Sequence, residues 1–271
     1  MSRIGPALEA LRRRGEVALF PFLMAGDPDL DTTMRLALAA EAAGADGFEI
    51  GVPFSDPTAD GPVLQRSAER AIRRGASLSR VLGWVREFRR HSQLPIILFG
   101  YYNPIFRYGP EQFAKDAAAA GVDGCLVVDL PPEEADELQK FTDAAGLDFI
   151  FLLAPTSGVE RIKLVAARAR GFIYYVSLTG VTGARATLPE DLAPAIARLR
   201  RHTRLPLGVG FGISSPDQAA AVSSYADVVI VGSAVMRLVE QHSESERAVA
   251  EVGTFLASLK VAMRQQQKKQ A

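Results

Sequence analysis

The sequence predicts an α/β protein of the (β/α)8-barrel (TIM barrel) class, with one extra helix before the first strand. Short runs rich in β-branched and aromatic residues alternate with longer amphipathic stretches along all 271 residues. This alternation is typical of a parallel sheet that is covered by helices. Eight such apolar runs are present, and a closed eight-stranded barrel commonly needs about 250 residues.

The expected elements follow from hydrophobic periodicity. The extra N-terminal helix is predicted from the helical spacing of Ile4, Leu8 and Leu11. The eight expected strands are apolar runs: 17–24, 47–52, 95–101, 124–129, 148–153, 171–177, 205–211 and 227–231. The amphipathic segments expected as helices between them are 30–43, 61–74, 110–120, 132–145, 159–169 and 189–201.

An open, doubly wound sheet is the competing fold. Its dinucleotide-binding form needs G-x-G-x-x-G after the first strand, where this chain has Ala25-Gly26-Asp27-Pro28. A loose internal repeat favours repeated units instead, because Asp46, Asp123 and Asp227 each lead into an apolar run. No linker or low-complexity tract divides the chain, so residues 1–271 are expected to form one domain, with a polar tail over 263–271 that frays.

Composition narrows the class of protein. Lys+Arg and Asp+Glu both number 31, so there is no electrostatic argument for a nucleic-acid partner. No apolar run approaches the roughly 18 residues of a membrane span, and the N-terminus lacks the apolar stretch of a signal peptide. A single cysteine and three histidines leave no disulfide and no Cys/His metal cluster. We therefore expect a soluble, cytoplasmic protein without a metal, in which Cys125 is a core residue or, alternatively, a reactive thiol.

Glu49 is the sharpest catalytic candidate, because it stands in the middle of an apolar strand. Side chains alternate along a strand, so if Phe48 and Ile50 face the helices, Glu49 points into the barrel mouth, where such enzymes keep their catalytic groups. A buried carboxylate costs several kcal/mol unless it is paired or neutralised. Proton transfer is the favoured interpretation. A glutamate bonded to backbone amides or to a distant tyrosine is the alternative.

Asp60 follows eleven residues later, across a loop stiffened by proline and glycine. It precedes Gly61-Pro62 at the start of a helix, so it is either a helix N-cap or the second carboxylate of an acid/base pair. Ser55, Asp56 and Asp27 have the character of turn formers. Asp129, before Leu130-Pro131-Pro132, has three open roles: a helix cap, a partner that orients a tyrosine, or a pocket-lining residue.

Glycine-rich turns follow the last two strands, at 208–216 and 231–234. In barrels of this class these turns form a phosphate site, where backbone N–H groups and a helix N-terminus meet a dianion. The alternative is that the glycines only make tight turns. A third glycine-rich piece, 177–185, suits a mobile lid over the substrate. A surface loop without function is the alternative there.

With these residues in view, the chain resembles the α subunit of tryptophan synthase over nearly its whole length. The likeness rests on segments 49–57 and 59–62, which are highly specific, and on Ala25–Pro28, Tyr102–Pro104, Gly180–Gly183 and Gly210–Ile213. The resemblance implies a barrel that cleaves indole-3-glycerol phosphate to indole and glyceraldehyde 3-phosphate without a cofactor. It also implies a pyridoxal-phosphate-bearing β subunit, which receives indole through an internal tunnel in an αββα heterotetramer.

The resemblance also implies a role for each matching position. Glu49 is then the acid/base, and Asp60 accepts the indole N–H and bonds Thr182 when the lid closes. Loop 53–60 and the lid then communicate with the β subunit, although Leu178 stands where some members have a basic lid residue. Residues expected at the substrate are Phe22, Phe99, Tyr174 and Phe211 around the ring, Gly183, Gly212, Gly232 and Ser233 at the phosphate, and Asp129 and Thr182 in the pocket.

Three other functions stay open on the sequence. The first is a free-standing indole-releasing lyase of the same family that needs no β subunit. The second is a weakly catalytic regulatory subunit that mainly activates its partner, against which the presence of both Glu49 and Asp60 argues. The third is another phosphate-binding barrel, such as a sugar-phosphate isomerase, whose substrate has no indole.

Overall fold

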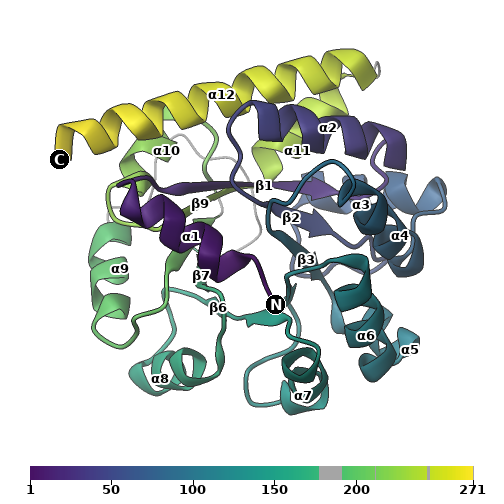
Figure 1. Ribbon diagram of the computed structural model, residues 1–271, viewed down its shortest axis with the longest axis horizontal. Coiled ribbons are helices and arrows are strands. Elements are labelled where there is room, and N and C mark those ends of the chain that lie inside the picture. The colour runs from purple at the N-terminus through teal and green to yellow at the C-terminus, as the bar shows by residue number, and fades with distance from the viewer. Residues whose placement is uncertain (177–190, 211, 243–244, 271) are drawn as a thin grey trace.

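The structure, a computed structural model, describes residues 1–176, 191–210, 212–242 and 245–270. In these residues parallel strands form one sheet in the order β5-β4-β3-β2-β1-β9-β8-β7-β6, which curves into a nearly closed barrel. Helices surround the strands, and α1 lies across the end of the barrel that faces the viewer (Figure 1). The predicted (β/α)8 barrel with an additional N-terminal helix is confirmed.

Every expected strand is present, although each is shorter than predicted and the fifth is divided. Phe151 stands at the division: its carbonyl accepts from the Tyr174 N–H, so here the chain passes from pairing with β4 to pairing with β7. The strands are β1 Ala18–Met24, β2 Phe48–Gly51, β3 Ile96–Gly100, β4 Gly124–Val127, β5 Asp148–Ile150, β6 Leu152–Leu153, β7 Ile173–Val176, β8 Leu207–Gly210 and β9 Val228–Val231.

The helices include all six expected segments and two that were not expected, α4 and α5. Ser77 caps α4. The apolar face of this helix includes the buried Leu78, Val81 and Val85, which have the spacing of an amphipathic helix. The helices are α1 Ile4–Arg13, α2 Leu30–Ala42, α3 Pro62–Arg73, α4 Leu78–Phe88, α5 Tyr102–Tyr108, α6 Pro110–Ala120, α7 Asp136–Ala144, α8 Val159–Arg168, α9 Leu192–Arg200, α10 Pro216–Ser223, α11 Ser233–Gln241 and α12 Ser245–Gln270.

The C-terminal segment is the end of the last helix. The segment expected to fray from residue 263 continues α12 as far as Gln270, and Met263 is buried in the core. Helix α12 packs against α2 and α10, along one side of the barrel (Figure 1). The Lys260 ammonium, which is almost completely buried, donates to Asp46 at 2.6 Å and to the Val17 carbonyl at 3.0 Å. This contact joins the C-terminal helix to the chain around the first two strands.

The repeated aspartates at the starts of strands have a common structural role. Each accepts the N–H of a residue at the start of a neighbouring strand: Asp46 from Leu19, Asp123 from Ile96 and Asp227 from Leu207, at 2.9, 2.8 and 2.7 Å. Each also binds a basic side chain: Lys260, Arg89 and Arg200 in the same order. A charge-assisted acceptor therefore satisfies the first N–H groups of three strands at the N-terminal end of the barrel.

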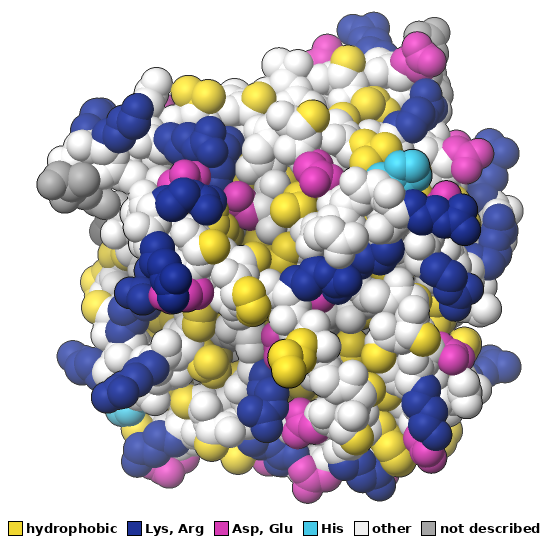
Figure 2. Space-filling model, viewed as in Figure 1, with side chains coloured by type: hydrophobic (Ala, Val, Ile, Leu, Met, Phe, Trp, Pro, Cys, Tyr) yellow, Lys and Arg dark blue, Asp and Glu magenta, His cyan; other side chains and the backbone are white. Residues whose placement is uncertain are grey.

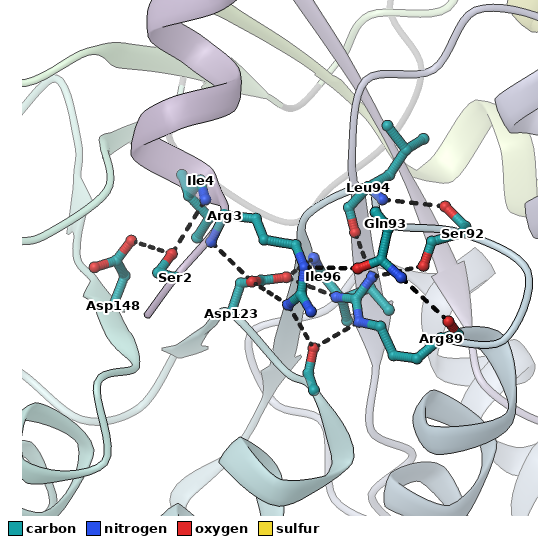
Figure 3. A network of polar contacts seen from close by, with 11 residues as sticks. Ser2, Arg3, Ile4, Arg89, Ser92, Gln93, Leu94, Ile96, Asp123 and Asp148 are labelled. Atoms are coloured by element: carbon teal, nitrogen blue, oxygen red, sulfur yellow. Dashed lines mark hydrogen bonds and ion pairs between the residues drawn. The ribbon is translucent and has the colours of Figure 1, made fainter.

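Asp123 is the most buried of the three and also fixes α1 (Figure 3). Its Oδ1 accepts from the Arg3 backbone N–H and from Arg3 Nη1, both at 2.9 Å, and its Oδ2 accepts from Arg89 Nη2 at 2.6 Å. Ser2 adds a second attachment by donating to Asp148. The extra helix is thus held against the barrel by buried polar groups as well as by its apolar face.

Replacing Asp123 with alanine should destabilise the protein strongly. The Asp123→Ala variant would leave Arg89, whose side chain is 10% exposed, without its carboxylate. Loss of one partner of a buried ion pair costs about 3–5 kcal/mol. Urea denaturation of the two proteins gives the difference in the free energy of unfolding. Glu111→Ala, which breaks an exposed pair with Lys115 within α6, is the control and should show no measurable change.

Candidate active site

A cavity lies at the C-terminal ends of the strands, where barrels of this class bind their substrates. It encloses about 480 Å³ of empty space, counting its open mouth. The cavity is lined by Phe22, Glu49, Leu64, Phe99, Tyr174, Gly212, Ile213, Ser214, Ile230, Gly232, Ser233 and Ala234. Seven of the predicted site residues are therefore brought together from β1, β2, β3, β7 and the turns after β8 and β9.

Glu49 points into this cavity because of the alternation along β2. Phe48 on one side of it is completely buried and packs edge-on against Phe88 of α4, with ring centroids 5.5 Å apart. The same strand therefore sends Phe48 towards the helices and Glu49 inwards, as the sequence predicted. Glu49 is 1% exposed, and its Oε1 has no hydrogen-bond partner among the described residues.

The surroundings of Glu49 favour its neutral form. Burial raises the pKa of Glu49 to about 8, because the carboxylate loses its hydration without gaining a cation. Tyr174 lies close enough to Glu49 to interact with it electrostatically. The pKa of the Tyr174 hydroxyl is raised mainly by burial and secondly by the charge of Glu49. A carboxyl with a pKa near 8 is mostly protonated at neutral pH and is available as a proton donor.

Asp60 lies on the turn that leads into α3, and it does not cap this helix. The N-cap is Gly61, and no side chain of the described residues caps α3, so the alternative role of Asp60 as a helix cap is wrong. The carboxyl is 4% exposed and accepts from the Tyr101 hydroxyl, which in turn accepts the Ala59 N–H at 3.0 Å. Asp60 is not one of the lining residues, but Leu64, one turn further along, is.

The pKa of Asp60 is raised less than that of Glu49. Burial raises it to about 6, while the hydrogen bond from Tyr101 lowers it. At pH 7 Asp60 is therefore mostly ionised, whereas Glu49 is mostly protonated. Two carboxyl groups whose surroundings push their pKa values apart are the usual basis for separate acid and base roles.

The turns after β8 and β9 provide a place for an anion. Gly212 has a φ of +87°, a left-handed conformation that disfavours other residues. Gly232 is the N-cap of α11, and within the described ranges no side chain caps this helix. The N–H groups of its first turn therefore lack acceptors within the helix, which favours a negative group. No lysine or arginine is among the described residues that line the cavity.

The remaining predicted site residues lie elsewhere or outside the described residues. Asp129 accepts the Tyr102 N–H at 2.7 Å and lines a separate surface hollow beside α5, not the cavity that contains Glu49. Thr182, Gly183 and Phe211, and the expected lid, lie outside the described residues. Cys125 is buried, and burial raises the pKa of its thiol to about 12, which fits the core interpretation.

Five lining residues were not named individually from the sequence: Leu64, Ile213, Ser214, Ile230 and Ala234. Of these, Ile213, Ser214 and Ala234 lie within the predicted glycine-rich turns. Leu64 lies one helical turn after Asp60. Ile230 sits in the last strand next to the turn at Gly232.

A wider hollow opens at the opposite end of the barrel, below α1. Figure 2 shows this face, on which basic and acidic side chains are interspersed. Glu9, Arg12, Arg170 and Arg204 are among the residues around the hollow. It contains no C-terminal end of a strand and neither Glu49 nor Asp60, so we place the active site at the other end.

Among the described residues no group of three or more His, Cys, Asp or Glu side chains is close enough to bind a metal ion. None of the described helices is both long and apolar enough to cross a membrane.

Comparison with known proteins agrees with the geometry. Residues 8–264 match the sequence profile of the family described as tryptophan synthase alpha chain. The tryptophan synthase alpha chain of Geobacter sp. (strain M21) is 54% identical over 260 residues, which cover 96% of this chain and 97% of that one. The solved tryptophan synthase subunit alpha of Legionella pneumophila str. Paris superposes with a TM-score of 0.91 at 40% identity, over 98% of this chain and 99% of that one.

A chain of the tryptophan synthase complex from Pyrococcus furiosus also superposes, with a TM-score of 0.82 at 38% identity. The superposition covers 89% of this chain and 97% of that one.

The fold and the cavity define a (β/α)8-barrel enzyme with carboxyl groups at the C-terminal ends of its strands. The chain belongs to the tryptophan synthase alpha chain family. It is a carbon–carbon lyase of tryptophan biosynthesis, which cleaves indole-3-glycerol phosphate.

The burial of Glu49 should make stability depend on pH. Its ordinary pKa of 4.5 applies to the unfolded chain, and about 8 to the folded one. The stability that neutral Glu49 contributes is complete below pH 4.5 and is lost as the pH rises through 8, because the unfolded chain releases this proton first. Glu49→Gln removes this loss, so relative to wild type it should gain about 2–5 kcal/mol in unfolding free energy between these pH values.

Denaturation of both proteins at several pH values measures this difference. The exposed Glu251 provides the control, since Glu251→Gln should follow wild type at every pH. A difference between Glu49→Gln and wild type that does not change with pH would contradict the protonated state assigned to Glu49.

Proposed function

We propose that Glu49 and Asp60 divide the catalytic work of cleaving indole-3-glycerol phosphate to indole and glyceraldehyde 3-phosphate. The observation that carries this proposal is the pair of buried carboxyl groups with pKa values of about 8 and about 6. One of them is protonated and the other ionised at neutral pH. Cleavage needs both forms, because a proton must be delivered to carbon while a positive charge develops on the ring.

Glu49 acts as the acid and then as the base. Its protonated carboxyl delivers a proton to C3 of the indole, which leaves positive charge on the ring nitrogen. The resulting carboxylate removes the proton of the neighbouring hydroxyl as the aldehyde forms. The bond between C3 and the glycerol carbon breaks, and its electron pair returns to the ring and neutralises it. Glu49 ends protonated, so a single residue completes both transfers.

Asp60 stabilises the intermediate. Its carboxylate accepts the indole N–H, and it attracts the ring more strongly once the positive charge has developed, which lowers the barrier. The Tyr101 hydroxyl keeps Asp60 in place and helps to keep it ionised. Thr182 adds a bond to Asp60 when the lid closes over the substrate.

The other site residues hold the two ends of the substrate. Phe22 and Phe99, whose rings meet edge-to-face at 5.4 Å, form one wall of the ring site together with Tyr174 and Phe211. The backbone at Gly183, Gly212, Gly232 and Ser233 binds the phosphate. Binding the phosphate by N–H groups leaves no cation near Glu49 that would lower its pKa.

The partner that we propose is a tryptophan synthase β subunit, in an αββα assembly in the cytoplasm. Pyridoxal phosphate belongs to that subunit, and the cleavage itself uses no cofactor. Loop 53–60 connects the two proteins: Ser55 and Asp56 are exposed, and the same loop ends at Asp60. Docking at the exposed part of the loop therefore acts on the carboxylate that receives the indole N–H.

Two measurements test the reaction and the partner. The purified chain is incubated with indole-3-glycerol phosphate, and indole is detected by chromatography. Faster release after addition of the β subunit supports the assembly, whereas equal release with and without it would favour the free-standing lyase. Turnover of a sugar phosphate that has no indole, with no indole release, would reject the assigned reaction.

Neutral replacements of the two carboxyl groups should abolish most of the activity. Glu49→Gln should lower kcat by about 10²–10⁴-fold, because loss of general acid–base catalysis has that size. Asp60→Asn should also lower kcat strongly while the fold is retained. Steady-state indole release and thermal unfolding check both variants. Near wild-type turnover of Glu49→Gln, or normal turnover with lower stability in Asp60→Asn, would remove that residue from the mechanism.

The pH dependence of kcat/KM should be bell-shaped, since it reports the ionisation of the free enzyme. Activity should rise as Asp60 ionises around pH 6 and fall as Glu49 loses its proton around pH 8. Indole release measured between pH 5 and 9 tests this. In Asp60→Asn the rise at low pH should disappear while the fall at high pH remains. A profile with no decline above pH 8 would contradict the proton-donor role of Glu49.

A further inference from the structure

The motif Ala25-Gly26-Asp27-Pro28 follows β1, and the proposed mechanism does not use it. Asp27 lies in a turn, as the sequence predicted, since its N–H donates to the Met24 carbonyl at 3.2 Å. Its side chain is 1% exposed and bonds residues of α3. Arg70 forms a bidentate pair with it, from Nε to Oδ1 at 2.8 Å and from Nη2 to Oδ2 at 2.7 Å. The buried Ser67 hydroxyl donates to Oδ2 at 2.5 Å. A bidentate arginine–carboxylate pair fixes orientation as well as distance.

Arg70 extends this contact to a third element. Its Nη1 donates to Oε1 of Glu240, near the end of α11, at 2.8 Å. Arg66, one turn earlier in α3, forms a second bidentate pair with Glu240, with both bonds at 2.7 Å. The hydrogen bonds from Arg66, with those from Arg70, lower the pKa of Glu240 to about 2, so it is charged throughout the working range. We refer to Asp27, Arg66, Arg70 and Glu240 as the brace.

The brace joins the elements that carry the two ends of the proposed substrate site. Helix α3 begins just after Asp60, and α11 begins at the Gly232–Ser233 turn. Arg70 lies ten residues after Asp60, about 15 Å along the helix, and Glu240 lies seven residues after Ser233, about 10 Å. Helices are stiff over these lengths. A fixed contact between their far ends therefore limits how the near ends can move apart.

The first strand completes this frame. Helices α3 and α11 pack against each other, and both pack against β1. Phe22 of β1 lines the cavity, and Asp27 follows the end of the same strand. The brace thus links the strand that carries a ring-site residue to both helices. None of its four members lines the cavity.

We propose that the brace is a positioning element, which sets the separation between the Asp60 carboxylate and the phosphate-binding turn at Gly232–Ser233. This inference rests on the proposed function, because only a substrate that has a ring at one end and a phosphate at the other spans this separation. The brace makes no contact with the substrate. It acts through the two helices, and an error of about 1 Å in such a placement can cost 100-fold in rate.

The test compares the whole substrate with its two halves. Glu240→Ala cuts the bonds between α11 and α3 but leaves the Asp27–Arg70 pair intact. It should lower kcat/KM for indole-3-glycerol phosphate about 10–100-fold. The dissociation constants of inorganic phosphate and of indole, each measured alone by NMR titration, should stay within about twofold of wild type, because a fragment does not sense the separation. Glu240→Gln, which keeps the shape and an acceptor oxygen, should fall between wild type and Glu240→Ala.

Arg73→Met is the matched control, because it breaks an ion pair with Glu69 inside α3 that reaches no other element. It should match wild type in every assay. If Glu240→Ala does not fold, Glu240→Gln carries the same comparison. A kcat/KM within twofold of wild type in the folded variant would overturn the inference. The inference would also be overturned if the dissociation constants of phosphate and of indole both rose in Glu240→Ala by the same factor by which kcat/KM fell. Wild type is assayed alongside. If wild type releases no indole, the proposed function and the inference about the brace are both wrong. If wild type is active, the result for Glu240→Ala tests the brace alone.

Discussion

The burial of one carboxyl group, that of Glu49, is the constraint on which the active site depends. A charge in this position has no compensating cation, so the group is held neutral well above its ordinary pKa. Phe22 and Phe99 line the same space and help to exclude water from it. The turns after β8 and β9, which we propose bind the phosphate, bring no lysine or arginine to the cavity lining among the described residues. Each of these features helps to keep Glu49 protonated at neutral pH.

At the opposite, N-terminal end of the barrel, carboxylates have a structural role instead. Asp46, Asp123 and Asp227 pair with basic side chains and accept N–H groups at the starts of neighbouring strands. There the carboxylates are paired, and they stabilise the frame. At the C-terminal end Glu49 is left without a cation, and it is available for chemistry. The difference lies in whether an arginine or lysine lies within reach, since burial is common to Asp123 and Glu49.

The sequence alone predicted most of what depends on short-range patterns. The strands, the inward direction of Glu49 and the turn at Gly232 follow from alternation and from glycine chemistry, and the structure has all of them. What the sequence left open depends on partners far along the chain. For Asp60 it allowed either a helix cap or the second carboxylate of an acid/base pair, because its partner, Tyr101, lies at the end of another strand; the structure excludes the cap. Asp27 stands in a turn as predicted, but nothing in its own segment indicates its pair with Arg70.

Two other differences have local causes. The fifth strand divides at Phe151, and this break is invisible to hydrophobicity because 148–153 is apolar almost throughout. Helix α4 was not expected, although Leu78, Val81 and Val85 have helical spacing behind the Ser77 cap. Hydrophobic periodicity was therefore sufficient to predict α4. The division of the fifth strand can be found only from the strands with which each of its halves pairs.

The attachment of Lys260 to Asp46 and Val17 has a consequence for how the protein is made. The first strand pairs with β9 as well as with β2, and Lys260 of α12 supplies a charge at the start of both early strands. A ribosome delivers β1 and β2 long before it delivers either of these later partners. The first strand therefore lacks one of its two pairing partners until residues 228–231 have been synthesised, and the barrel cannot close before then.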